Sequence, residues 1–69
     1  MKLYQITIKG QRMARSVNSP DTPAMRVLYY MDKNGTVSNE QIESNAGVDA
    51  TEIPTAVGTL RRRGMIQEV

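Results

Sequence analysis

Most of the predicted fold follows from one segment, the deciding stretch Ser38–Ile66, SNEQIESNAGVDATEIPTAVGTLRRRGMI. It begins with Ser38, followed three residues later by Gln41, a spacing that is typical of a capping box at the start of a helix. Gly47 is expected to end that helix in a left-handed turn, because glycine adopts a positive φ more readily than other residues. The stretch therefore predicts two short helices that are joined by a glycine turn.

The second of these helices is predicted to have one apolar face and one polar face. Its core face holds residues spaced four, three and four apart: Ile53, Val57, Leu60 and Gly64. The opposite face holds hydroxyl side chains, a glycine and arginines: Thr51, Thr55, Gly58, Thr59 and Arg62, flanked by Arg61 and Arg63. Such a helix can enter a groove of DNA, although any surface helix also has a polar face.

Two residues disturb the regularity of this helix. Pro54 lacks an amide hydrogen, so either the first turn is kinked or the helix proper begins at Thr51. Gly58 lies in mid-helix, where glycine lowers helix stability by up to about 1 kcal/mol relative to alanine. Because Gly58 points outward, it is consistent with a close approach of DNA and equally with a weakness that the fold tolerates.

The residues before the deciding stretch predict a strand and two helices. Residues 2–8 alternate and are expected to form a strand that ends at Gly10. The side chains on the buried face of that strand are Tyr4, Ile6 and Ile8. A short helix is expected over residues 11–17, with Arg12 and Arg15 outside. Residues 18–23 form a turn-rich linker, which leads into the longer helix.

The longer helix is predicted over Pro23–Lys33, with Thr22 or Asp21 as its cap and proline in the first helical position. Its apolar residues follow the helical pattern: Ala24, Val27, Leu28 and Met31. Gly35 is expected to close it with a positive φ. A two-residue strand at Thr36–Val37 and a final strand at Met65–Val69 complete the expected elements.

The composition restricts the chemistry of this 69-residue chain. It contains no cysteine and no histidine, so disulfides, zinc sites of the usual ligand types and imidazole catalysis are not expected. We expect no enzymatic activity, cofactor, metal or small-molecule substrate. Residues 1–20 contain no apolar run that is long enough for a signal peptide or a membrane span, which predicts a cytoplasmic protein without a membrane partner.

Charge is unevenly distributed along the chain, although the net charge is only +2. Residues 1–20 carry four basic side chains and no acidic one: Lys2, Lys9, Arg12 and Arg15. Residues 21–50 carry two basic and five acidic side chains, and residues 51–69 carry three arginines and two acids. A basic arm and a basic late helix on either side of an acidic middle suggest a one-sided positive surface, or simply charges that keep a small protein in solution.

The deciding stretch resembles the winged helix-turn-helix family of DNA-binding domains, as found in small prokaryotic and archaeal transcription regulators. The resemblance rests on the aliphatic and glycine positions of both helices: Ile42, Gly47 and Val48, then Ile53, Val57, Leu60, Gly64, Met65 and Ile66. A second match precedes them, since Tyr4–Gly10 and the basic residues after it are similar to the second wing strand of that family. We therefore expect the N-terminal strand to pair antiparallel with Met65–Val69, within the chain or, less favoured, by swapping with a partner.

The resemblance implies an α+β fold in one domain over residues 1–69. Residues 1–17 would form a strand and a short basic helix, and residues 23–69 a three-helix helix-turn-helix core. The small antiparallel sheet would come from the N- and C-terminal strands, with the wing reduced or permuted. Its expected partner is double-stranded DNA, with the last helix in the major groove and the chain acting in transcription regulation. The expected DNA-binding residues are Thr51, Thr55, Thr59, Arg61, Arg62, Arg63, Lys9, Arg12 and Arg15.

A protein-interaction or dimerisation module without DNA binding is the alternative. Tyr29 lies off the core face of the longer helix, and with Met25 beside it could form a contact in a homodimer. The competing interpretation is that Tyr29 covers the N-terminal helix of its own chain.

Overall fold

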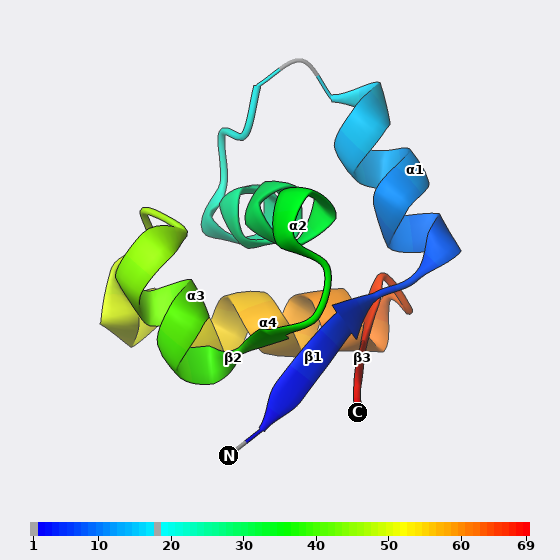
Figure 1. Cartoon of the computed structure of the whole chain (residues 1–69). Coiled ribbons are helices and arrows are strands. Elements are labelled where there is room, and N and C mark those ends of the chain that lie inside the picture. Colours follow the sequence, from blue (N-terminus) through cyan, green and yellow to red (C-terminus); the bar gives the residue numbers. More distant parts are fainter. Residues whose placement is uncertain (1, 18) are drawn as a thin grey trace.

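In the computed structural model, residues 2–17 and 19–69 are described, and they form four α-helices, one short 3₁₀ helix and a three-stranded antiparallel sheet (Figure 1). The elements in chain order are β1 (Leu3–Ile6), α1 (Ile8–Ser16), α2 (Pro23–Asn34), β2 (Val37–Ser38), α3 (Asn39–Asn45), η1 (Ala50–Glu52), α4 (Ile53–Arg62) and β3 (Ile66–Glu68). The α+β class that the sequence predicts is confirmed. Asn18, at the start of the predicted linker, lies outside the described residues.

The strand β1 is the centre of the sheet, whose order is β2-β1-β3. Both of its neighbours run antiparallel to it: Tyr4 pairs with Val37 on one side and with Glu68 on the other. The amide of Val69 donates to the carbonyl of Leu3 at 2.9 Å, which extends the pairing with β3. The predicted pairing of the N- and C-terminal strands thus forms within the chain, and β2 adds a second partner that the sequence did not predict.

The strand β1 is shorter than predicted. It ends at Ile6, because the hydroxyl of Thr7 accepts a hydrogen bond from the amide of Gly10 at 3.2 Å and so begins α1. Ile8 was expected on the buried face of the strand, but it is the first residue of α1 and is 69% exposed. The predictions that Gly10 ends the strand and that the helix starts at residue 11 are therefore wrong.

Gly10 is instead buried in the first half of α1, where the helix touches the turn before β3. A Cβ atom at this position would lie 2.1 Å from the carbonyl oxygen of Met65. That same carbonyl accepts a hydrogen bond from the amide of Thr7 at 2.9 Å. The close approach of the two backbone segments therefore requires glycine at position 10.

The helix α2 begins at Pro23, as its sequence predicts, and ends at Asn34, one residue later than predicted. The Thr22 hydroxyl accepts from the amide of Met25 at 3.2 Å, and Pro23 takes the first helical position. Gly35 follows the helix with φ 77°. The side chains of α2 supply the centre of the core, because Val27, Leu28 and Met31 are fully buried.

The capping box at the start of α3 is confirmed. The Ser38 hydroxyl accepts from the Gln41 amide at 3.1 Å, and the Gln41 side-chain oxygen accepts from the Ser38 amide at 2.8 Å. Gly47 has φ 72° in the turn that follows. The predicted short strand exists, but it is shifted by one residue to Val37–Ser38 because Ser38 still pairs with Leu3.

The helix α4 is preceded by the 3₁₀ turn η1, which the side chain of Asp49 caps by accepting from the Thr51 amide at 3.1 Å. The α-helix proper begins at Ile53, so that Pro54 occupies its first turn, where the missing amide is tolerated. Ile53, Val57 and Leu60 are buried as predicted.

Gly64 does not lie on the core face of α4, as the spacing predicted. The helix ends at Arg62, and Gly64 is exposed in the turn beyond it with φ 72°. Its carbonyl accepts from the Thr7 hydroxyl at 2.7 Å, which joins this turn to the start of α1.

No helix in the described part of the chain is long and apolar enough to cross a membrane.

We predict that Gly10→Ala lowers the free energy of unfolding by about 1–3 kcal/mol, because the new methyl group would overlap a backbone carbonyl that cannot move freely. Urea unfolding followed by circular dichroism measures this change. Lys9→Ala, at an exposed position of the same helix turn, is the matched control and should leave stability nearly unchanged. Equal stability of Gly10→Ala and the wild type would contradict the close contact between α1 and the Met65 turn.

Candidate nucleic-acid interface

Two hollows lie beside α4, and they are lined by different residues of this helix. On one side, the hydroxyl residues predicted from the sequence lie along a hollow of about 290 Å³ between α4 and the start of α2. The residues that line it are Thr22, Pro23, Ala24, Thr51, Glu52, Thr55, Ala56 and Thr59. Thr51 and Thr55 are exposed and Thr59 is half-buried. This side thus brings the three predicted threonines together, but its only charged residue is acidic.

The three predicted arginines lie at the end of α4, and all are exposed. Arg61 forms an ion pair with Glu68 of β3, with 3.6 Å between Nη1 and Oε1. Within residues 2–17 and 19–69, neither Arg62 nor Arg63 forms an ion pair. Cations at this end of a helix also interact favourably with the helix dipole, so their position has a structural benefit of its own.

The basic residues of α1 are spread along that helix, and only its first turn lies near these arginines. Lys9 and Arg12 are exposed, and Lys9 lies in the first turn of α1, which Figure 1 shows close to the end of α4. Arg15 lies at the opposite end of α1, where its Nη2 atom is 3.7 Å from Oδ1 of Asp32 in α2. That carboxylate oxygen is buried and has no hydrogen bond in the described part of the chain, so Arg15 supplies its compensating charge.

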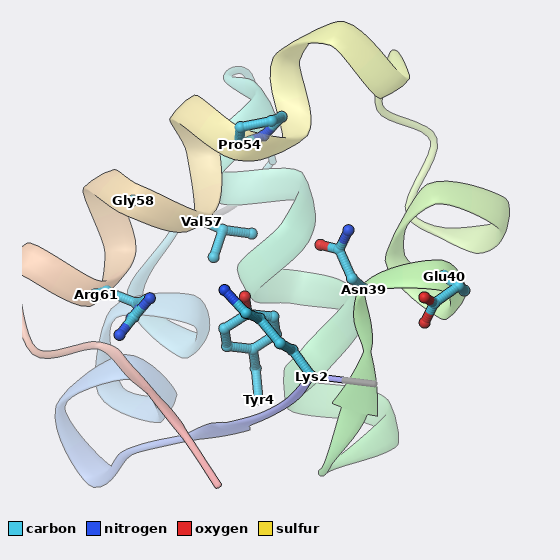
Figure 2. Close-up of a pocket in the computed structure, with 8 residues that line it drawn as sticks. All are labelled: Lys2, Tyr4, Asn39, Glu40, Pro54, Val57, Gly58 and Arg61. Carbon is cyan, nitrogen blue, oxygen red and sulfur yellow. The ribbon is translucent and has the colours of Figure 1, made fainter.

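A second and larger hollow lies on the other side of α4, between that helix, β1 and the start of α3 (Figure 2). Its volume is about 510 Å³, and it is lined by Lys2, Tyr4, Asn39, Glu40, Pro54, Val57, Gly58 and Arg61. In Figure 2 the side chain of Tyr4 in β1 and that of Lys2, the residue before this strand, both extend toward α4. Sequence reasoning did not place Lys2 or Asn39 beside α4, because no local pattern reports which strand a helix packs against.

The tyrosines of α2 make contacts within the chain. The hydroxyl of Tyr29 donates to the carbonyl of Val17 at the end of α1. The hydroxyl of Tyr30 accepts from the side chain of Asn45 at 3.4 Å. The geometry favours the interpretation in which Tyr29 covers the N-terminal helix over the one in which it forms a contact with a partner.

Neither a cluster of metal ligands in the described part of the chain nor a known relative indicates what this surface binds. Among the described residues, no cluster of three or more histidine, cysteine, aspartate or glutamate side chains is placed to hold a metal ion. Comparison of the chain with protein-family models, with curated proteins and with solved structures finds no match.

Proposed function

We propose that this chain is a DNA-binding domain of the winged-helix type that acts as a small transcriptional regulator. The observation that carries the proposal is the exposure of α4: one face is buried in the core, while its outer side and its arginine-rich end face solvent. In this proposal α4 enters the major groove of duplex DNA, where a helix fits, and the arginines at its end contact phosphates.

The arrangement around α4 supports a helix-turn-helix role. The capped helix α3 and the turn at Gly47 precede α4, and β3 follows it directly. The strand β1 lies between β2 and β3 and pairs with both. Its sequence is similar to that of a second wing strand. A wing strand that precedes the helices in the sequence can thus occupy the sheet beside α4 and support it as a following strand would.

The charges of α4 support a polyanionic partner. Arg62 and Arg63 are exposed and form no ion pair with other residues of the described segments 2–17 and 19–69. The pair between Arg61 and Glu68 is about half exposed and therefore weak, so a phosphate can replace the carboxylate. We propose binding rather than catalysis, because guanidinium and hydroxyl groups are suited to nucleic-acid recognition and the chain has no histidine or cysteine.

We predict that the 69-residue chain binds a short DNA duplex at low salt, and that its affinity falls steeply as the salt concentration rises. Arg62→Ala should weaken binding and reduce the slope of log K against log salt by about 1, because one phosphate contact is lost. Fluorescence anisotropy with a labelled duplex in a salt series measures both quantities.

The matched control for this variant is Lys33→Ala, which removes an exposed cation at the end of α2. It should leave the salt slope unchanged. If the wild-type chain shows no duplex binding at low salt, the proposed function is wrong. If Arg62→Ala and Lys33→Ala change the slope equally, the end of α4 is not the contact surface.

A homodimerisation module is the second candidate, and one observation favours it. Leu3 and Val69 are neighbours in the sheet, and they are 37% and 68% exposed. If this apolar pair forms a dimer contact, light scattering should show a mass that rises with protein concentration, and Val69→Ser should abolish that rise. A constant monomer mass for the wild type would remove this candidate.

A further inference from the structure

Gly58 differs from every other glycine of the chain, because nothing in the fold requires it. Gly35, Gly47 and Gly64 have positive φ values, and at Gly10 a side chain would overlap a backbone carbonyl. Gly58 has no positive φ, and a Cβ atom there would have no heavy atom within 4 Å beyond the neighbouring backbone of its own helix. Alanine would fit this position and would favour the helix more than glycine does.

The space beside Gly58 is the larger hollow of about 510 Å³ (Figure 2). Pro54 precedes Gly58 by about one helical turn and Arg61 follows it by about one turn, so all three lie along the side of α4 that faces this hollow. Because Gly58 has no side chain, the main chain of α4 is open to a ligand at the middle of this side.

The charges of the two hollows beside α4 distinguish them. The hollow at Gly58 contains two basic residues, Lys2 and Arg61, and one acidic residue, Glu40. The hollow on the threonine side contains no basic residue and one acidic residue, Glu52. A polyanion is therefore attracted to the side that carries Gly58.

We propose that a segment of the sugar–phosphate backbone of duplex DNA lies in the hollow at Gly58. Lys2 and Arg61 neutralise its phosphates, and the missing side chain of Gly58 lets it approach the main chain of α4. The side-chain nitrogen of Asn39 donates one N–H to Oε1 of Glu43 at 3.3 Å, and its second N–H donates to the DNA backbone.

This inference rests on the proposed function. It turns the DNA-facing side of α4 from the threonines toward Pro54, Gly58 and Arg61. It also adds Asn39 to the contact residues and assigns Lys2, from the basic arm, to the hollow at Gly58.

A pair of alanine substitutions on α4 tests which side faces the DNA. Gly58→Ala should raise the midpoint of thermal unfolding by about 4–8 °C, because alanine favours the helix. It should also weaken duplex binding by about tenfold, because the methyl group occupies the space of the ligand. Thr55→Ala, at an exposed position on the threonine side, is the comparison variant and should weaken binding less than Gly58→Ala does.

A charge-removing pair tests the same hollow through the salt dependence. Lys2→Gln should reduce the slope of log K against log salt by about 1, whereas Lys33→Gln, outside the hollow, should not change it. Gly58→Ala changes no charge, so its slope should equal that of the wild type.

The outcomes separate this inference from the function on which it rests. If the wild type binds duplex DNA, but Gly58→Ala binds equally well and Thr55→Ala binds weakly, the threonine side faces the DNA and the inference is overturned while the function stands. If the wild type binds no duplex, both are overturned. A stabilised Gly58→Ala variant with weakened binding and an unchanged salt slope is the result that the inference requires.

Discussion

The insertion of β1 between β2 and β3 is the interaction on which the rest of the structure depends. The two neighbours have only two and three residues, too few to form a sheet without the central strand. The inward side chains of β1, Tyr4 and Ile6, are buried in the core that the four helices share. The same strand leads into α1, whose Gly10 touches the turn before β3. Residues that are far apart in the sequence are thereby held in one unit, and α4 is fixed against it.

This topology also determines which charges meet beside α4. Lys2, before β1, and Arg61, at the end of α4, line the same hollow, although most of the chain lies between them in the sequence. Arg15, which belongs to the same basic arm as Lys2, is turned toward Asp32 and stabilises the contact between α1 and α2. The basic arm therefore does not act as a unit: part of it is available to a polyanion and part of it maintains the fold.

The sequence predicted the features that depend on local chemistry. The capping box at Ser38, the cap at Thr22 and the turns at Gly35 and Gly47 form as expected, because each is specified by residues within about one turn of one another. The periodicity of α4 correctly predicted that Ile53, Val57 and Leu60 are buried. The α+β class and the pairing of the terminal strands were instead expected from the resemblance of the sequence to winged helix-turn-helix domains.

The sequence predictions were wrong where two local patterns overlap, and they were incomplete where the position of a residue depends on the tertiary structure. The alternation of β1 continues to Ile8, but the cap at Thr7 begins a helix there and exposes that side chain. The spacing of Gly64 matches the core face of α4, yet spacing does not distinguish a last helical residue from the turn after it. The place of Lys2 and Asn39 beside Gly58 follows from the position of β1 in the sheet, which no pattern within the sequence specifies.

The central claim, that duplex DNA binds across α4 on the side of Gly58, is tested most directly by nuclear magnetic resonance of the ¹⁵N-labelled chain during titration with a short duplex. We expect the largest amide shifts at Gly58, Arg61 and Asn39, with little change at Tyr29, whose hydroxyl donates to the carbonyl of Val17 at the end of α1. Shifts that gather at Thr22 and Thr55 would place the DNA on the threonine side. The absence of any shift at low salt would contradict DNA binding itself.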